Sequence, residues 1–538
     1  MAKKASPPKP KPKPKPSRSV RIRMYRQGLG DCFLITFQIG SAKTHAVIDC
    51  GVLSGSPKGS DRIQKAVADI QKETRGTIDL LIATHEHADH LSGFNQAQAT
   101  WNEMTVKKTW LAWTEDLASP AVASMKKRQE MRMAAIVAGE AKLAKEAGQL
   151  SATSPDDPQT KQKDKLERGA ATLRNLLRFS LDEDDDPPDV LKAQSKPSGP
   201  SRALQWLKER AGTNLEYCHP SHPPRPLPGR DDVTVYVLGP PDGPLLRYED
   251  PDRPGEGYLV RGSLTGDACF GLAAVDADLL KPKSAVANPA LFGQKNADAA
   301  SPFDPFYQLA FDKVKDAKPG SELGEAHVFF KERYGFGDAD KAPYRRIDHD
   351  WLGFAESMAL SQISYVNNTS LVLAFELVEG GPVLLFPGDA QIGSWLSWKD
   401  LSWEVGTGSQ RRTVTGPDLL KQTVFYKVGH HGSHNATLKE GGLEVMTNPE
   451  LVAFIPVHQG TAKSHDWVMP WGNLRTKLNT SNVAGRVILS DQDEAKDMQT
   501  KPPDSATGPA ADRWAAFTGA LTWDTSPDTL WVDYTYHY

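Results

Sequence analysis

Hydrophobic and polar positions alternate along residues 19–51 in a pattern that is typical of β-strands. Three strands are expected at residues 19–25, 31–40 and 44–51. Residues 60–74 instead repeat their apolar side chains at helical spacing, with Ser60 or Asp61 as the expected N-cap. A strand at 77–85, a helix at 92–104 and a strand at 107–113 follow. This order of elements predicts a layered α/β domain rather than a helix bundle.

Strand patterns return in the second half of the chain. Strands are expected within residues 233–241, 362–390, 422–429, 450–457, 485–490 and 529–536. The segment 362–390 should form a hairpin that turns at Glu379, Gly380 and Gly381. Together, the regular segments are consistent with one domain made of two similar halves.

Two long stretches interrupt this pattern. Residues 115–213 are rich in Ala, Lys, Glu, Arg and Gln, which predicts two or three long helices with a flexible acidic turn near 183–189. Residues 242–350 contain many Pro, Gly and Asp and predict irregular structure. We therefore expect a tail at 1–18, a first half at 19–113, a helical insertion at 114–213, a return to the core at 214–241, an irregular insertion at 242–360 and a second half at 361–538.

Length and charge limit the class of protein. A chain of 538 residues is too long for one compact core, so we expect two to four domains or one domain with large insertions. The net charge of −3 gives no strong overall attraction to nucleic acid. The tail at 1–18 is locally basic, and its alternating prolines predict disorder or polyproline II. It would serve as a solubilising linker or, alternatively, as a hook for nucleic acid or an acidic partner.

The cysteines bear on compartment and metal chemistry. Cys32, Cys50, Cys218 and Cys269 form no CxxC pair, which argues against a cysteine zinc site and a disulfide scaffold. A reducing compartment is therefore favoured. The N-terminus lacks the apolar segment of a signal peptide, and no run of about 18 apolar residues predicts a membrane span. We expect a cytoplasmic protein without membrane association.

The most informative stretch is ATHEHADHLSG, residues 83–93, which follows an apolar strand. Side chains two apart in an extended segment point the same way, so His85 and His87 can reach one metal ion. After a turn, Asp89 and His90 can reach a second ion. Imidazole and carboxylate ligands together suit Zn²⁺, Mn²⁺ or Fe²⁺ better than Ca²⁺.

Two later strand ends add similar side chains. Asp389 follows an apolar strand in a Gly-Asp turn, and His430 and His431 follow another strand. Each has an ordinary alternative role: Asp389 as a helix cap, and the histidines as parts of a hydrogen-bonded turn. Considered together, the three strand ends favour a site for two metal ions.

These motifs resemble those of the metallo-β-lactamase superfamily, whose HxHxDH signature is similar to HEHADH at 85–90. Further blocks resemble the soluble hydrolase domain of the DNA-uptake protein ComEC: MYRQGLGDCFLITF, HAVIDCG, NNTSLVLAFEL with VLLFPGDA, and KVGHHGSHNAT. The resemblance covers roughly 20–113, 233–241 and 362–490. It implies an αββα four-layer sandwich, with large helical and irregular insertions in this chain, and two divalent metal ions, Zn²⁺ or Mn²⁺.

The resemblance also implies roles for individual residues. The expected metal ligands are His85, His87, Asp89, His90, Asp389 and His430. Asp89, Asp389 and His431 would take part in catalysis, with Asp389 bridging the ions and either His430 or His431 binding the second ion. Asp49 would orient a ligand histidine, and Asp31 would do the same or serve in a turn. Ser433 and Asn435 would bind a substrate oxygen or close their loop. Members of the superfamily often bind the first ion with a third histidine, for which this chain offers no clear candidate. His219 and His222 are the nearest by order, but they lie in a proline-rich loop.

The chemistry so implied is metal-assisted hydrolysis. The ComEC-like blocks favour a nuclease or phosphodiesterase acting on nucleic acid or nucleotides, and the Lys/Arg-rich residues 126–175 agree, although they equally suit a solvated helix face. One alternative is a hydrolase of a small ester, lactone, thioester or amide. Another is a subunit that binds a partner protein through residues 114–213. The membrane channel segments of ComEC have no counterpart here, so DNA transport is not implied.

Overall fold

The computed structural model describes residues 17–151, 154–181, 198–247, 313–314, 316–318, 320–334, 351–408, 411–481, 483–492 and 507–538. Of the tail expected at 1–18, residues 1–16 lie outside these ranges. Arg18 belongs to the first strand. The acidic turn near 183–189 and most of 242–350 also lie outside them. None of the described helices has both the length and the apolar character that a membrane crossing requires.

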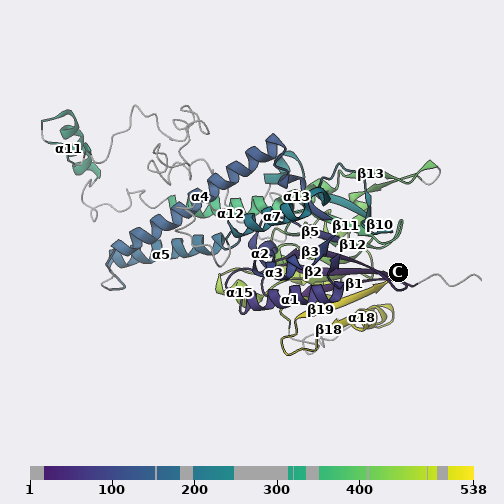
Figure 1. Ribbon diagram of the computed structural model, residues 1–538. Helices are drawn as coiled ribbons and strands as arrows, with labels where there is room; N and C mark the ends of the chain where they lie inside the picture. The colour runs from purple at the N-terminus through teal and green to yellow at the C-terminus, as the bar shows by residue number, and fades with distance from the viewer. Residues whose placement is uncertain are drawn as a thin grey trace, which may run out of the picture.

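The larger sheet has eight strands in the order β18–β19–β1–β2–β3–β5–β7–β8 (Figure 1). Their bounds are Arg18–Tyr25 (β1), Cys32–Ile39 (β2), Ala42–Cys50 (β3), Leu80–Ala83 (β5), Thr109–Ala112 (β7), Leu215–Cys218 (β8), Leu521–Trp523 (β18) and Trp531–His537 (β19). Strands β3, β5, β7 and β8 run parallel, whereas β1 pairs antiparallel with both β2 and β19. The two ends of the described chain therefore meet in one sheet.

The second sheet has seven strands in the order β17–β16–β15–β12–β11–β10–β9. Their bounds are Arg225–Leu227 (β9), Arg230–Gly239 (β10), Val372–Glu376 (β11), Val383–Phe386 (β12), Thr423–Lys427 (β15), Val452–Ile455 (β16) and Val487–Leu489 (β17). Strands β11 and β12 form the predicted hairpin, and β12, β15, β16 and β17 run parallel. Two short pairs stand apart: Thr77–Ile78 (β4) with Thr105–Val106 (β6), and Ser402–Val405 (β13) with Arg412–Thr415 (β14).

Helices accompany both sheets. Their bounds are Gly59–Thr74 (α1), Ala88–Gln96 (α2), Gln98–Asn102 (α3), Pro120–Gln149 (α4), Pro158–Leu177 (α5), Gly199–Ala211 (α7), Glu322–Tyr334 (α11), Trp351–Asn368 (α12), Ile392–Trp398 (α13), Gly416–Lys421 (α14), Gln459–Ser464 (α15), Gly472–Thr480 (α16) and Pro509–Gly519 (α18). Helices α4, α5 and α7 confirm the long helices predicted within 115–213. Figure 1 shows that α4 and α5 extend away from the sheets.

Three clusters of buried side chains connect these layers. One lies between the two sheets, where Phe33 and Phe37 of β2 approach Phe386 and Phe375 at ring-centroid distances of 5.7 and 6.0 Å. Another joins the first sheet to α1, α2 and α7, and the third joins the second sheet to α5, α12 and α13. Neighbouring residues of β2 enter different clusters because strand side chains alternate between the two faces.

Some predicted elements are wrong in detail. Residues 362–368 end helix α12 instead of starting a strand. This part of α12 is buried on several sides, so its apolar residues carry no clear helical period, and a buried helix and a buried strand then look alike. Helix α11 lies in the stretch predicted to be irregular. Helix α1 begins at Gly59 with Lys58 as its N-cap, not Ser60 or Asp61.

Candidate metal centre

Three strand ends bring the candidate ligands together. His85 and His87 follow β5, and Asp89 and His90 lie in the first turn of α2. Asp389 follows β12, and the histidine pair follows β15. Strand β5 belongs to one sheet and β12 and β15 to the other, so the face-to-face packing of the sheets places these loops against one another.

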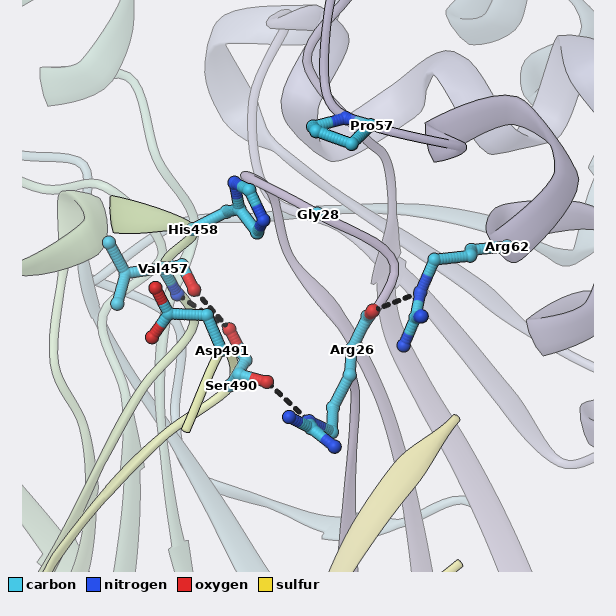
Figure 2. Close-up of a pocket in the computed structure, with 8 residues that line it drawn as sticks. All are labelled: Arg26, Gly28, Pro57, Arg62, Val457, His458, Ser490 and Asp491. Atoms are coloured by element: carbon cyan, nitrogen blue, oxygen red, sulfur yellow. Dashed lines mark hydrogen bonds between the residues drawn. The ribbon is translucent and has the colours of Figure 1, made fainter. Parts of the chain in front are cut away.

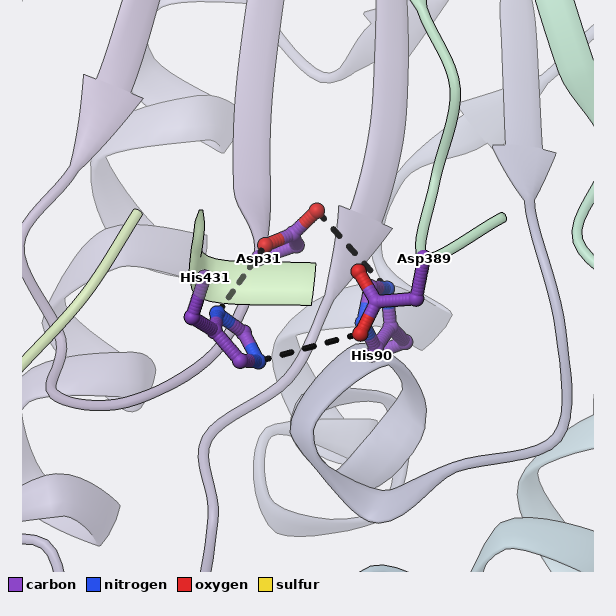
Figure 3. A group of neighbouring side chains, drawn as sticks. All are labelled: Asp31, His90, Asp389 and His431. Atoms are coloured by element: carbon purple, nitrogen blue, oxygen red, sulfur yellow. Dashed lines mark ion pairs between the residues drawn. The ribbon is translucent and has the colours of Figure 1, made fainter. Parts of the chain in front are cut away.

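Four side chains form the tightest group: Asp31, His90, Asp389 and His431 (Figure 3). One potential ligand atom from each lies within 4.8 Å of the others. His90 Nε2 is 3.1 Å from Asp389 Oδ2, and His431 Nε2 is 3.8 Å from the same oxygen. All four side chains are buried.

Asp89 borders the same space. Its Oδ2 is 2.7 Å from His431 Nε2 and 3.6 Å from His90 Nε2. Ligands of a tetrahedral zinc ion lie about 2.0–2.2 Å from the metal, which places them roughly 3.3–3.6 Å from each other. The spacing of these nitrogen and oxygen atoms is therefore close to that of a coordination shell.

Several atoms in this region are buried and make no hydrogen bond to the described residues. They are His87 Nε2, Asp89 Oδ1, His90 Nε2 and Asp389 Oδ2. Buried polar atoms almost always have a partner. Divalent cations would satisfy these atoms, so the donor set fits metal binding.

Hydrogen bonds to neighbouring residues determine which imidazole nitrogen of His90 and of His431 faces the candidate metal ligands. His90 Nδ1 is 2.8 Å from Asp49 Oδ2, and His431 Nδ1 is 2.6 Å from the Pro456 carbonyl oxygen. Each Nδ1–H donates to that oxygen, which leaves the Nε2 lone pair for a metal. Asp49 itself accepts hydrogen bonds from the Thr84 amide and hydroxyl at 2.7 and 2.8 Å. Asp49 thus connects the imidazole of His90 to the backbone and hydroxyl of Thr84.

His85 and His87 form a neighbouring pair, with His85 Nε2 3.0 Å from His87 Nδ1. Burial lowers the pKa of His87 to about 4 and that of His85 well below its ordinary value. Both imidazoles are therefore neutral at pH 7, the form that binds metal. His219 and His222 do not complete this pair: within the described ranges, His219 contacts Ser221 and Asp242 instead.

His430 lies beside the group of four rather than in it. Its Nδ1 is 2.8 Å from Ser433 Oγ and its Nε2 is 3.4 Å from Asn367 Nδ2, while its backbone N–H donates to Asp389 Oδ1 at 3.0 Å. Ser433 also donates to Asn435 Oδ1 at 3.0 Å, so it closes this loop. Of the two histidines that the sequence left open, His431 has the nitrogen that faces Asp89 and Asp389.

Lys427 is the important residue that the sequence reading missed. Its Nζ is 2.5 Å from Asp31 Oδ2 and 3.1 Å from Asp389 Oδ1, and the side chain is buried. Burial would lower the pKa of Lys427, but the two carboxylates keep it above its ordinary value. Burial raises the pKa of Asp31 to about 6, against the effect of Lys427. The sequence feature that could have indicated Lys427 is its position at the end of an apolar strand, just before His430 and His431.

Helix α4 contacts the histidine motif through a partly buried ionic cluster. Glu86, between His85 and His87 in sequence, accepts a hydrogen bond from Lys126 Nζ at 2.8 Å. Lys126 also binds Glu115 at 2.5 Å. After α5, the Phe179 carbonyl accepts a hydrogen bond from the Ala88 amide at 2.7 Å, and its ring lies 5.7 Å from that of His87. The helical segment thus forms part of the wall around the motif.

We expect Lys126→Met to weaken metal binding at His85 and His87 by about 10-fold, because Glu86 loses its ion pair and keeps only the hydrogen bond from the Ser201 hydroxyl. Zn²⁺ titration against a competing chelator measures this change. Lys127→Met is the matched control, since Lys127 is exposed on the same helix. Equal affinity in the two variants would show that α4 does not position the motif.

Metal binding should release protons near pH 7. Burial would lower the pKa of His90, but Asp389, Asp31 and other carboxylates hold it well above its ordinary value in the metal-free site. A metal ion must displace that proton, so affinity should increase with pH up to this pKa and level off above it. Calorimetry in buffers of different ionisation enthalpy detects the released protons. A metal affinity that stays constant from about pH 6 to 8 would contradict this expectation.

Comparison with known proteins identifies the first part of the chain. Residues 25–109 match the family model described as Metallo-beta-lactamase superfamily. This segment includes Asp31 and the motif at 85–90 but not Asp389 or His431. Neither a curated protein nor a solved structure matches the chain. The chain therefore carries a metallo-beta-lactamase superfamily domain at residues 25–109, and together with its cluster of possible metal ligands this domain indicates a metal-dependent hydrolase.

Proposed function

We propose that the protein is a phosphodiesterase or nuclease that acts on nucleic acid or nucleotides and uses two divalent metal ions, Zn²⁺ or Mn²⁺. The observation that carries the metal chemistry is the convergence of His90, Asp389 and His431 from separate strand ends, with buried atoms that have no other partner. The choice of a phosphodiester is supported by the ComEC-like blocks that contain Asp389 and His431.

The proposal includes the four-layer αββα arrangement of the superfamily. Its support is the order of the buried clusters: one between the two sheets and one on the outer side of each sheet, where helices pack. In this arrangement the loops after β5, β12 and β15 meet at one edge of the paired sheets. A substrate would reach the metal ions from that edge.

A divalent metal ion in this site would lower the pKa of a bound water to near neutrality and so supply a nucleophile. Asp89, His90, Asp389 and His431 would hold one ion. His85 and His87 would hold the other, with Asp389 between the two.

The remaining side chains act on these ligands. Asp49 and the Pro456 carbonyl keep the histidines oriented, and Lys427 offsets the negative charge of Asp31 and Asp389. Because Lys427 holds Asp389 Oδ1, the other oxygen of that carboxylate remains directed at the histidines.

A substrate panel tests the proposal. The full chain would be loaded with Zn²⁺ or Mn²⁺ and assayed on bis-p-nitrophenyl phosphate, DNA, RNA and cyclic nucleotides, alongside a lactone, a thioester and an amide. We expect metal-dependent cleavage of phosphodiesters that a chelator abolishes. Full metal occupancy with cleavage of only the other substrates would favour the small-molecule hydrolase, and no cleavage at all would favour a partner-binding role.

A further inference from the structure

A pocket of about 150 Å³ opens where the ends of β1, β16 and β17 meet the start of α1 (Figure 2). The polar residues that line it are Arg26, Arg62, His458, Ser490 and Asp491. None of the candidate metal ligands lines it, so it is a separate site. It is linked to the metal centre along the chain, because His458 lies two residues after Pro456, whose carbonyl contacts His431.

Arg62 brings to this pocket a positive charge that has no direct ion pair among the described residues. Its Nε donates to the Arg26 carbonyl at 2.7 Å, and its Nη2 donates to the Asp528 carbonyl at 2.9 Å. Among the described residues, Arg62 forms no ion pair with a carboxylate, and its Nη1 makes no hydrogen bond. A guanidinium that is bound only to neutral carbonyls keeps its full charge for an anion.

A neutral hydrogen-bond donor also favours an anion. Arg26 forms one wall of the pocket, where its guanidinium donates to the carbonyls of Ser490, Gln492 and Thr529 at 2.5, 2.6 and 3.1 Å. His458 Nδ1 accepts a hydrogen bond from the Thr461 amide at 3.0 Å, so its proton is on Nε2 and available as a donor. Burial lowers the pKa of His458 below its ordinary value, although Asp491 opposes this shift and Arg62 adds to it, so this donor is mainly neutral at pH 7.

We propose that this pocket binds a phosphate group. Its volume equals about five water molecules at roughly 30 Å³ each, which is enough for a phosphate. Pockets for whole small molecules usually measure about 300–1,000 Å³, so a nucleoside is too large. Arginine forks are preferred ligands for phosphate oxygens. If the proposed function holds, the occupant is a substrate phosphate that neighbours the one being cleaved; phosphate binding itself does not depend on that function.

Asp491 allows a test in which phosphate binding should become stronger, because its negative charge repels an anion in the pocket. Its carboxylate lines the pocket and accepts a hydrogen bond from the Gln459 amide at 2.6 Å. Asparagine would keep an acceptor oxygen there while removing the negative charge. Asp491→Asn should therefore bind phosphate about 5-fold more tightly. A misfolded protein would not bind more tightly, so this variant separates the proposal from a loss of structure.

The experiment titrates inorganic phosphate into the metal-free full chain, so that phosphate cannot bind to metal. We expect wild type to bind, and Arg62→Gln to weaken binding by about 10-fold or more, because a charged hydrogen-bond donor is lost. Lys72→Gln is the matched control: it removes the same charge from an exposed position on α1 and should change nothing. Thermal unfolding of Arg62→Gln shows whether the carbonyl contacts of Arg62 also affect folding.

Kinetics then connect the pocket to the substrate. Arg62→Gln should raise KM for an oligonucleotide but not for bis-p-nitrophenyl phosphate, which has no second phosphate. Phosphate binding could be tighter in Asp491→Asn, weaker in Arg62→Gln and unchanged in Lys72→Gln while no phosphodiester is cleaved. That result would support the phosphate pocket and contradict the proposed function. If phosphodiesters are cleaved but the variants bind phosphate equally, or Lys72→Gln acts like Arg62→Gln, the pocket proposal is overturned.

Discussion

Asp389→Asn should empty the metal centre and reduce hydrolysis by about 10³-fold or more, since a bound metal contributes several kcal/mol to the transition state. Asp389 Oδ2 lies 3.1 Å from His90 Nε2 and 3.8 Å from His431 Nε2, without a hydrogen-bond partner among the described residues. An amide has the same shape and can still accept the hydrogen bond from the His430 amide, but it lacks the charge that attracts a cation. The fold should therefore survive while metal binding is lost.

Elemental analysis of the purified variant measures the metal content, and the rate on bis-p-nitrophenyl phosphate measures the hydrolysis. Asp400→Asn is the control, because Asp400 is exposed in the turn that follows α13. That variant should keep its metal and its rate. Two ions per chain and an unchanged rate in Asp389→Asn would exclude Asp389 as a ligand.

Arg23→Ala should lower the free energy of unfolding by about 3–5 kcal/mol, the usual cost of leaving a buried charge without its partner. Arg23 on β1 donates to both oxygens of Asp533 on β19 at 2.7 and 2.8 Å and to Asp69 on α1 at 2.6 Å. Its guanidinium also lies 3.6 Å from the ring centroid of Trp531. Arg23 and Asp533 are buried, so removing the arginine leaves Asp533 only the longer ion pair with Arg21, at 3.5 Å.

Urea unfolding followed by tryptophan fluorescence measures this loss. Arg411→Ala is the comparison, because the Arg411–Glu404 pair is exposed and should contribute little to stability. Equal stability of the two variants would mean that the buried pair does not hold the C-terminal strand. Faster hydrogen exchange in β19 of Arg23→Ala would identify that strand as the part that loosens.

The chain sequence alone predicted the strands that carry the chemistry and most of the ligand-type residues at their ends. The alternation of β1 and β2 and the apolar run of β5 are local patterns, since each depends only on which face a side chain occupies. The motif at 85–90 is likewise local, because His85 through His90 reach the same region from one loop. The same locality explains the failure at 362–368, where a helix buried on several sides has no distinct period.

Only the tertiary structure decided how these local pieces combine. The contact of His90 with Asp389 joins loops from two different sheets. The buried pair of Lys427 with Asp31 and the partly buried pair of Glu86 with Lys126 join segments far apart in the chain. The same holds for the choice of His431 over His430 as the residue facing Asp89. Such contacts depend on how sheets and helices pack, and the packing of distant segments leaves no periodic signal in the residues that take part.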